Sequence, residues 1–303
     1  MYDIAICIPT YKRPYMLEKL INSIIECNFN QSFTKNVNLI IVDNDIEKTA
    51  EKIVVELKER FKDKIEMEYY NFPVKGLSNV RNELLRRSLD RALDFVVFVD
   101  DDEYVSTEWL NKLVDALISN KADMAMGPVI SICDNTVSKY ISCWFNRPIY
   151  QKNTQLNSIA TNNLIIKSES LIKNNVWFDN RFNYTGSEDS YFGIQMIQKG
   201  AKIFWAENAT VYETVPKDRA NLKWLIQRRY RVSGTYTYIM NLEKKYFKLL
   251  EKTLVNIAYI LIGICALVVL PLPIKRKYWG ILKITEGFGG LSGFFNTLYQ
   301  EYR

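Results

Sequence analysis

Four adjacent carboxylates follow a short apolar run about one third of the way along this 303-residue chain. The apolar run is Phe95-Val96-Val97-Phe98-Val99, and the acids are Asp100-Asp101-Asp102-Glu103. A short β-branched and aromatic run is typical of a buried strand in a parallel sheet, and open α/β sheets bind ligands at the carboxyl ends of such strands. Adjacent carboxylates repel one another, and oxygen ligands without nearby histidine or cysteine favour a hard cation, Mg²⁺ or Mn²⁺. The run therefore predicts a metal site with a phosphate-bearing substrate; an acidic N-terminus on a helix over 107–119 is the alternative.

The amino-acid composition limits the catalytic groups and binding partners that the chain could have. The chain contains no histidine, which excludes histidine zinc sites, Ser-His-Asp triads and histidine bases. We therefore expect any general base to be a carboxylate. The five cysteines are far apart without C-x-x-C spacing, and a strand begins almost at the N-terminus; both favour a reducing, cytoplasmic setting. A net charge of +6 suits a nucleotide substrate or an anionic membrane surface, and the pattern of basic residues does not indicate nucleic acid binding.

Strand and helix patterns alternate over the first 130 residues. We expect strands at 3–9, 37–42, 65–70 and 95–99, and helices at 16–25, 49–61, 76–93 and 107–119. This alternation predicts a parallel, doubly wound sheet. Polar residues end three of these strands, and the carboxyl ends of parallel strands meet on one edge of the sheet. Those strand ends are Thr10-Tyr11-Lys12-Arg13, Asp43-Asn44-Asp45 and Asp100-Asp101-Asp102.

The alternation weakens after residue 130. We expect a long irregular segment rich in aromatic residues over 131–160, then strand-like segments at 160–166, 202–205 and 210–213. Glu188-Asp189 precedes a helical pattern over 191–199, which Gly200 ends. A basic, aromatic helical pattern covers 224–238.

The C-terminal part contains a long apolar segment. Residues 253–274 carry no charge, with Lys252 before them and Lys275-Arg276-Lys277 after them. About 20 such residues suffice to span a bilayer. Asn256 and two prolines suit a re-entrant or interfacial helical hairpin equally well, and a buried helix of a soluble protein is the third interpretation. A second, glycine-rich apolar stretch over 278–295 could pack against the first.

Five motifs, in order along residues 3–235, resemble those of family 2 glycosyltransferases of the GT-A fold. They are Ile8-Pro9-Thr10-Tyr11-Lys12-Arg13, Asp43, Lys75-Gly76-Leu77-Ser78-Asn79-Val80-Arg81-Asn82, Asp100-Asp101-Asp102 and Glu188-Asp189. Each motif is weak evidence by itself, but their shared order and separations make the resemblance specific. It implies an α/β fold of the GT-A class, with a mostly parallel sheet flanked by helices and a C-terminal hydrophobic, membrane-associated helical segment.

The resemblance implies a role for each motif. Asp43 would contact the nucleotide base, and Arg81 would lie by the nucleotide. Asp102 would ligate Mn²⁺ or Mg²⁺, and Asp189 would be the catalytic base. The remaining donor-binding candidates are Pro9, Tyr11, Arg13, Asp100 and Asp101.

The chain departs from the family pattern at two places. Glu213 stands where many relatives carry a metal-binding histidine, so we expect Glu213 to be a second oxygen ligand. The segment from Gln227 to Arg231 matches the Q-x-x-R-W signature of processive members only in part, so processive polymerisation is not predicted. The expected acceptor or phosphate contacts are Asn163, Glu188, Trp224, Arg228 and Arg231. A strand-end turn is an equal alternative for Asn163. For Trp224 the alternative is core packing, which is the more frequent role of an aromatic residue at helical spacing.

The implied reaction transfers a sugar from a nucleoside diphosphate, UDP by family habit, to a hydroxyl of a lipid-linked glycan or surface polysaccharide. One base and one displacement imply inversion at the anomeric carbon. A nucleotidyltransferase and a catalytically silent membrane-bound adaptor are the alternatives. A dinucleotide oxidoreductase is excluded, because no G-x-G-x-x-G motif occurs.

These expectations define a domain organisation and a location. A GT-A domain would cover residues 1–240, with a nucleotide-binding half over about 1–103 and an acceptor half over about 104–240. A helical, membrane-associated region would cover 241–303. The enzyme would act at the cytoplasmic face of the membrane; its donor sugar, linkage and oligomeric state stay open.

Overall fold

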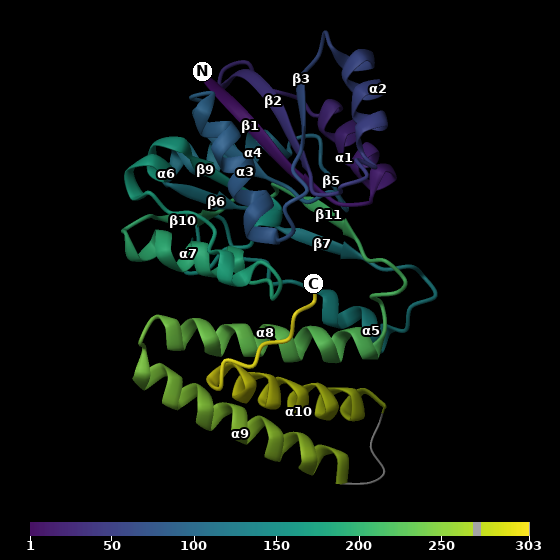
Figure 1. Ribbon diagram of the computed structural model, residues 1–303, viewed down its shortest axis with the longest axis vertical. Coiled ribbons are helices and arrows are strands. Elements are labelled where there is room, and N and C mark those ends of the chain that lie inside the picture. The colour runs from purple at the N-terminus through teal and green to yellow at the C-terminus, as the bar shows by residue number, and fades with distance from the viewer. Residues whose placement is uncertain (269–273, 303) are drawn as a thin grey trace. The chain divides into compact units, whose positions relative to one another are not determined.

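The computed structural model describes residues 1–268 and 274–302 of the chain, which folds into two compact units (Figure 1). The sheet unit comprises Met1–Ile132, Arg147–Asn180 and Glu188–Thr214. The helical unit comprises Cys133–Asn146, Arg181–Ser187 and Val215–Arg303. All five motifs that resemble the family lie in the sheet unit.

An eight-stranded sheet forms the centre of the sheet unit, in the order β3-β2-β1-β4-β9-β6-β10-β8. Strands β3, β2, β1 and β4 are parallel, whereas β9 lies antiparallel between β4 and β6. Strand β10 is parallel to β6, and β8 closes the edge antiparallel to β10. The strands are β1 (Tyr2–Thr10), β2 (Thr34–Asp43), β3 (Glu66–Asn71), β4 (Phe95–Phe98), β6 (Met124–Met126), β8 (Gln155–Leu156), β9 (Leu164–Lys167) and β10 (Ile203–Trp205). The predicted mostly parallel α/β sheet is confirmed.

Alternate residues of the central strands pack into two separate cores, one on each face of the sheet. Ile4, Ile6 and Ile8 of β1 join the core that α1, α2 and α4 cover. Ala5 and Cys7 join the opposite core, which α3, α6 and α7 cover. Burial on both faces explains why these strands read as unbroken apolar runs. The helices are α1 (Pro14–Ile25), α2 (Glu51–Phe61), α3 (Leu77–Asp90), α4 (Trp109–Ser119), α6 (Ser168–Asn174) and α7 (Glu188–Gln198), with 3₁₀ turns η2 (Thr161–Asn163) and η3 (Asn180–Phe182).

A second, three-stranded sheet adjoins the acidic run, in the order β5-β11-β7. Its strands are β5 (Glu103–Val105), β7 (Val129–Ile132) and β11 (Val211–Thr214). Strand β11 runs antiparallel to β5 and parallel to β7. Because β5 follows β4 directly, this small sheet brings the end of β11 beside the carboxyl end of β4.

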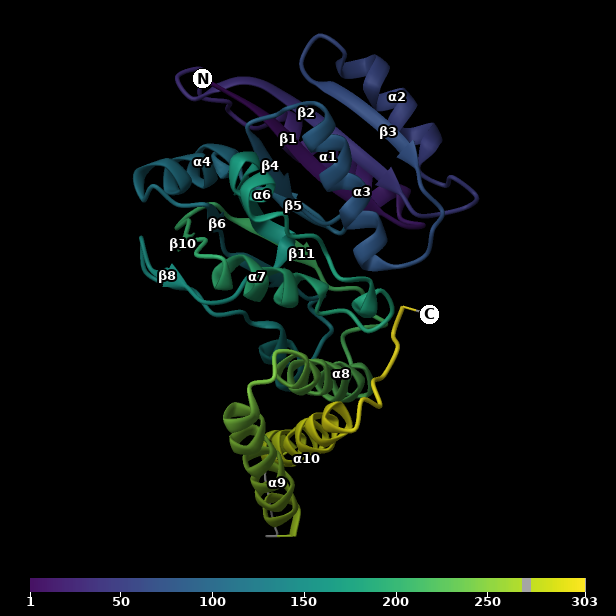
Figure 2. The same ribbon diagram turned by 60° about the vertical axis from the view of Figure 1, so that its left-hand side comes forward.

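The helical unit is built on three long helices. Helix α10 (Ile274–Phe294) packs against both α8 (Leu222–Leu242) and α9 (Tyr246–Val268), as Figures 1 and 2 show. Close approach is possible because glycines lie at both contacts: Gly280 faces Gly263 of α9, and Gly293 faces Gly234 of α8. The unit also contains α5 (Lys139–Ser142) and the 3₁₀ turn η1 (Cys143–Phe145).

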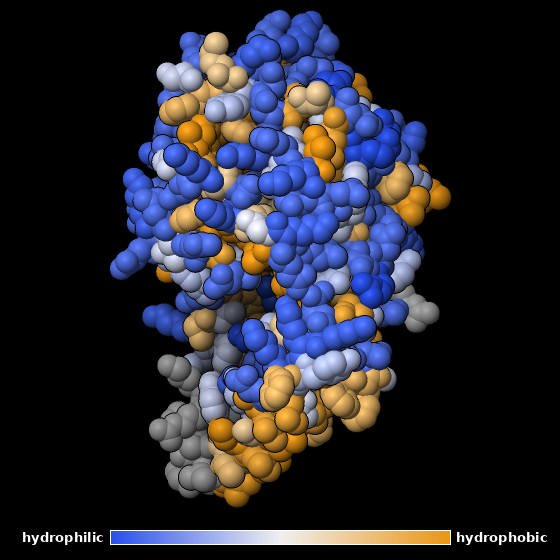
Figure 3. Space-filling model, turned by 90° about the vertical axis from the view of Figure 1, so that its left-hand side faces the viewer, coloured by the Kyte–Doolittle hydropathy of each residue, from blue (hydrophilic) through white to orange (hydrophobic). Residues whose placement is uncertain are grey.

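Helix α9 is, within the described part of the chain, the one helix long and apolar enough to cross a membrane. It has 23 residues, a mean hydropathy of 1.7 over its most apolar window, and 11% of that window buried. Its outer face exposes large apolar side chains, among them Phe247, Leu254, Leu261 and Val268. Figure 3 shows hydrophobic residues gathered at this end of the helical unit. The helix begins seven residues before the predicted apolar segment 253–274, and residues 269–273 of that prediction lie outside the described residues.

Candidate active site

The carboxyl ends of β1 and β4 meet because the two strands are parallel neighbours. Arg13 follows β1 and immediately precedes Pro14, the first residue of α1. Its Nη1 donates to Asp101 Oδ1 at 3.1 Å and to Asp102 Oδ2 at 2.8 Å. Thr10 Oγ1 also donates to Asp101, at 2.8 Å. The first and third predicted strand ends therefore form one cluster, centred on Arg13.

This cluster has more negative than positive charge. Asp101 and Asp102 are 5% and 9% exposed. Burial, together with the nearby Asp100, Asp101 and Glu213, raises the pKa of Asp102 to about 7, and Arg13 opposes this rise. Burial likewise raises the pKa of Asp101. Buried carboxylates whose ionisation is disfavoured in this way are stabilised by a further cation.

Glu213 lies beside Asp102 because of the small sheet. Glu213 of β11 pairs with Glu103 of β5, and Thr214 N donates to Asp102 O at 3.2 Å. The Glu213 carboxylate accepts from Arg147 Nη2 at 2.6 Å and from Ser131 Oγ at 3.1 Å. One oxygen of Glu213, Oε2, thus makes both of these hydrogen bonds.

The donor atoms fit a divalent cation that is shared with a substrate. No group of three or more histidine, cysteine, aspartate or glutamate side chains in the described ranges could hold a metal ion on its own. Mg²⁺ and similar hard cations are commonly held by one or two carboxylates together with substrate phosphates. Asp102 and Glu213 supply such a pair, and their excess negative charge favours it. Each of the two carboxylates also pairs with an arginine, Asp102 with Arg13 and Glu213 with Arg147.

Arg81 connects the two acidic motifs of the sheet unit. It lies on α3, is 7% exposed, and pairs through Nη1 with Glu188 Oε1 and through Nη2 with Asp100 Oδ1, the latter at 3.3 Å. Asp100 ends β4 and Glu188 begins α7, so Arg81 places the start of α7 beside the acidic run. Burial raises the pKa of Glu188, and Arg81 opposes that effect. Asp189 follows in the first turn of α7 and is partly exposed; its Oδ1 accepts from Ser190 N at 2.6 Å.

The end of β2 is built around a fully buried carboxylate. Asp43 accepts hydrogen bonds from Asp45 N at 2.9 Å, from Ala50 N at 3.2 Å and from the Tyr69 hydroxyl at 2.8 Å. These bonds fix the loop that follows β2, and Lys12 reaches this loop at 3.8 Å from Asp45. Contact between Asp43 and a nucleotide base stays a prediction; the geometry favours a role for Asp43 in shaping the loop.

Two further donor-binding candidates lie at the same strand end. Tyr11 is half exposed, and its backbone N donates to Asp101 Oδ2 at 3.4 Å. Pro9 lies within β1 opposite Val42. Tyr11 is therefore close to the acidic cluster, while Pro9 is part of the strand that carries it.

The Asn163 side chain is hydrogen-bonded within the fold. It is fully buried; Oδ1 accepts from Trp109 Nε1 at 2.8 Å, and Nδ2 donates to Pro128 O and Ala209 O. This placement favours a role in holding η2 in the fold. The neighbouring Asn162 donates to Glu103 Oε1 at 2.7 Å.

The three candidates on α8 belong to the helical unit. The Trp224 ring stacks on Phe145 with centroids 5.5 Å apart, and the Arg228 guanidinium lies 5.0 Å from the Trp224 ring. Arg231 is buried, donates to Thr185 O at 3.0 Å and pairs with Glu301 at 2.5 Å. Contacts of Trp224, Arg228 and Arg231 with an acceptor or a phosphate stay predictions.

Arg147 is a site residue that the sequence patterns did not indicate. Arg147 lies in the aromatic-rich irregular segment over 131–160, where no motif or periodicity distinguishes it from a basic residue exposed to solvent. Its pairing with Glu213 depends on β11 joining β5, a long-range contact. Thr10, by contrast, belongs to the Ile8–Arg13 motif, and its hydrogen bond to Asp101 gives it a positioning role.

Three features together define a nucleotide-sugar glycosyltransferase of the GT-A class. The sheet is α/β and mostly parallel, an acidic run lies at the end of its central strand, and a buried arginine joins that run to a second acidic pair. Comparisons with known proteins agree with this class. The model for "Glycosyl transferase family 2" matches residues 5–173, and that for "Glycosyl transferase family group 2" matches residues 95–285. The succinoglycan biosynthesis protein ExoM of Rhizobium meliloti (strain 1021) is 30% identical over 237 residues, covering 77% of this chain and 73% of ExoM. The chain belongs to glycosyltransferase family 2, which confirms the predicted enzyme class.

Solved structures show the same fold at low sequence identity. Residues 1–349 of S. aureus TarS in complex with UDP-GlcNAc match with a TM-score of 0.53 and 15% identity, over 99% of this chain and 93% of that one. A longer TarS chain gives a TM-score of 0.53 at 14% identity over 96% of this chain, which spans 55% of that TarS chain. GalNAc-T7 with UDP, GalNAc and Mn²⁺ matches with a TM-score of 0.58 and 12% identity, over 78% of this chain and 51% of that one. At these identities the similarity shows the fold alone, and the predicted GT-A fold is confirmed.

Proposed function

We propose that this enzyme transfers a sugar from a UDP-sugar, with inversion, to a hydroxyl of a lipid-linked glycan or a nascent surface polysaccharide. The observation that carries the proposal is the bridge from Asp100 through Arg81 to Glu188, because it places Asp189 in the helical turn next to the acidic run. The names of similar proteins support these substrate classes. ExoM is named for succinoglycan biosynthesis, and TarS is described with UDP-GlcNAc.

Two problems limit such a transfer, and the site has a group for each. A divalent cation, when bound, would neutralise the charge that gathers on the leaving diphosphate. Asp102 and Glu213 would hold the cation, and Arg13 orients the Asp102 carboxylate. Asp189 would take the proton of the acceptor hydroxyl as that oxygen attacks the anomeric carbon, and the nucleoside diphosphate leaves from the opposite side. General-base catalysis of this kind contributes about 10²–10⁴ in rate.

The helical unit supports an acceptor at a membrane. The exposed apolar face of α9 would be costly in water, and the exposed Lys244 and Lys248 near its start suit an anionic lipid surface. We infer that α9 and α10 associate with the cytoplasmic face of the cell membrane as a helical hairpin. The acceptor would then be presented to the enzyme at the same surface.

Substitution of Asp189 tests the proposed base. The detergent-solubilised enzyme is incubated with a panel of nucleotide sugars, and release of free nucleotide is measured with and without acceptor lipid extract. Asp189→Asn should keep nucleotide binding by isothermal titration in the presence of Mn²⁺ and lose about 10²–10⁴ in transfer rate. Asp63→Asn, at an exposed position of the sheet unit, is the matched control and should behave as wild type.

Two results would contradict the proposal. Near-normal turnover by Asp189→Asn would refute the assignment of the base. Absence of metal-dependent UDP binding in the wild-type protein would favour a catalytically silent adaptor.

A further inference from the structure

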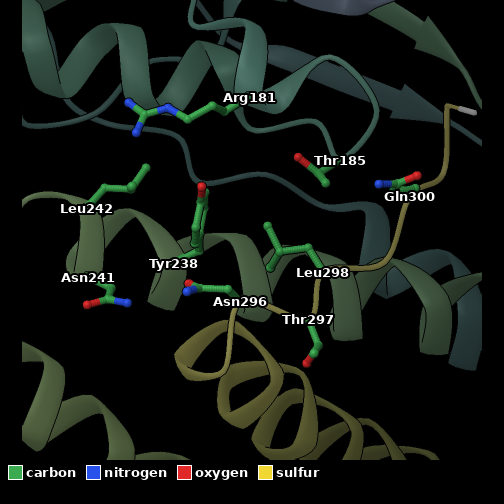
Figure 4. Close-up of a pocket in the computed structure, with 9 residues that line it drawn as sticks. All are labelled: Arg181, Thr185, Tyr238, Asn241, Leu242, Asn296, Thr297, Leu298 and Gln300. Atoms are coloured by element: carbon green, nitrogen blue, oxygen red, sulfur yellow. The ribbon is translucent and has the colours of Figure 1, made fainter.

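A polar pocket of about 530 Å³ lies within the helical unit, separate from the acidic residues described above. Its walls come from η3 and the loop after it, from the C-terminal end of α8, and from the tail that follows α10. Figure 4 shows that the Tyr238 side chain extends from α8 with its hydroxyl toward Arg181, and that Gln300 lies on the tail at the other side of the pocket. Ligand pockets of about 300–1,000 Å³ are typical of sites for small molecules.

The lining of this pocket is rich in neutral hydrogen-bonding groups. Asn241, Asn296 and Gln300 contribute carboxamides, Tyr238 contributes a hydroxyl, and Arg181 is the one charged side chain among the described lining residues. Carboxamides both donate and accept hydrogen bonds, as do the hydroxyls of a sugar. The Tyr238 ring packs edge-on against Phe182, with centroids 5.8 Å apart, which holds it in place. The lining thus favours a neutral, polyhydroxylated ligand.

The tail that forms one wall is held in a defined position. Tyr302 N donates to Tyr184 O at 3.1 Å, and Glu301 pairs with the buried Arg231 at 2.5 Å. These contacts follow directly after Gln300 and fix the end of the tail. A wall that is already ordered loses little conformational entropy when a ligand binds.

The pocket lies at the end of the helical hairpin that carries exposed aromatic residues. Tyr246 and Phe247 begin α9 a few residues after Asn241. Phe294 ends α10, and Phe295 follows it just before Asn296. All four aromatic side chains are exposed, Phe247 to 92%. Tyrosine is typical of the level where a membrane meets water, which suits Tyr246, and exposed phenylalanines beside it suit the apolar side of that boundary. A ligand in the pocket would therefore lie at the height of lipid headgroups.

We propose that this pocket is a second carbohydrate site, which binds a sugar of the membrane-bound acceptor away from the reacting hydroxyl. This inference rests on the proposed function, because it takes the acceptor to be a glycan at the membrane. The pocket would hold the glycan by hydrogen bonds from the carboxamides and Tyr238, and so increase the time that the acceptor spends on the enzyme.

The test measures binding of soluble saccharides to the full chain in detergent. The probes are cellobiose, lactose, laminaritriose and chitobiose, and inorganic phosphate is a separate probe. Binding is measured by saturation-transfer difference NMR and by tyrosine and tryptophan fluorescence. Tyr238→Phe and Gln300→Leu should each weaken binding about 3–10-fold, the effect of one lost hydrogen bond. Tyr236→Phe, at an exposed site on the same helix outside the pocket, is the control and should bind as wild type. Circular dichroism melting checks that each variant is folded.

Three outcomes would overturn the inference. One is equal saccharide binding by wild type and by folded Tyr238→Phe and Gln300→Leu. Another is binding of inorganic phosphate without any saccharide, which would make the pocket an anion site built on Arg181. The third is absence of saccharide binding by a protein that still hydrolyses its sugar donor. Donor hydrolysis by the wild-type enzyme reports on the proposed function separately, so failure of the pocket and failure of the enzyme assignment are distinguishable.

Discussion

Replacement of Arg81 by methionine tests the geometry that joins the two acidic motifs. Methionine keeps the aliphatic length of the side chain and removes its charge. The buried Glu188, 3% exposed, would then lose the arginine that neutralises it, and its Oε2 has no hydrogen-bond partner among the described residues. Breaking a buried ion pair by removing one partner costs about 3–5 kcal/mol. We expect a loss of this size in the free energy of unfolding, together with loss of sugar transfer.

The pH dependence of this loss follows from Glu188. Burial already raises the pKa of Glu188, and removal of Arg81 takes away the opposing effect, so the pKa in the folded variant rises further. A carboxyl whose folded pKa exceeds its unfolded value of about 4.3 binds more protons when folded. Stability of Arg81→Met should therefore fall as pH rises from 5 toward the folded pKa, by up to about 1.4 kcal/mol per pH unit in that window. The variant should be most destabilised, relative to wild type, at pH 8.

Urea unfolding followed by circular dichroism at pH 5.5 and pH 8 measures the effect. Arg86→Met is the matched control, because Arg86 lies on the same helix, is 49% exposed and pairs with Glu83, which keeps Arg87 as a partner. An exposed pair of this kind contributes about 0–1 kcal/mol. Glu188→Gln in the Arg81→Met background should recover about 2 kcal/mol, since a neutral amide replaces the unpaired carboxylate. The reasoning is refuted if Arg81→Met is no more destabilising than Arg86→Met at pH 8, or if Glu188→Gln adds to the loss.

Two further predictions concern the metal ligand and the helical hairpin. Asp102→Asn should lower nucleotide release about 10²-fold at saturating Mn²⁺ and shift the Mn²⁺ titration to higher concentration, because the amide carries no charge; an unchanged titration would contradict the assignment. Asn256 of α9 is fully buried with neither side-chain polar atom hydrogen-bonded in the described structure, so Asn256→Leu should stabilise the protein in detergent by about 1 kcal/mol. Gly290→Ala should destabilise the protein, since a Cβ there would overlap the Asn256 side chain. Thermal unfolding of the two variants measures both effects. A lower melting temperature for Asn256→Leu would show that the Asn256 side chain has a hydrogen-bond partner.

The parallel half of the fold was predictable because its signals are local. Strands β1, β2 and β4 are buried on both faces over much of their length, so each contains an apolar run that ends in polar residues. The order of those runs and the helices between them determine a parallel arrangement. The resulting meeting of Arg13 with the acidic run was expected from strand ends alone.

The antiparallel half was less predictable. A strand-like segment was expected near 160–166, but periodicity carries no information on direction, and β9 runs against both of its neighbours. Helix α9 begins at Tyr246 because Lys248, Glu251 and Lys252 are good helix formers, although their charge excluded them from the predicted apolar segment. Asp43 was assigned to a nucleotide by resemblance, whereas its three hydrogen bonds depend on a loop and on Tyr69 of the neighbouring strand β3, which no motif reveals.

The four acids after β4 look equivalent in the sequence, and their neighbours make them different. Each bonds to another part of the sheet unit: Asp100 to Arg81 of α3, Asp101 to Thr10 at the end of β1, Asp102 to Arg13 before α1, and Glu103 to Asn162 of η2. Glu103 is 1% exposed and also accepts from Asp100 N at 2.9 Å, so it folds the acidic run back on itself. Nearby Asp100 and Glu213 raise the pKa of both Glu103 and Asp102. Burial with this turn leaves Glu103 a structural acid, whereas Asp102 is less deeply buried, at 9% exposed. A cation would therefore relieve the negative charge of the acidic run more readily at Asp102 than at Glu103, and Asp102 is also the residue that the family motif indicates.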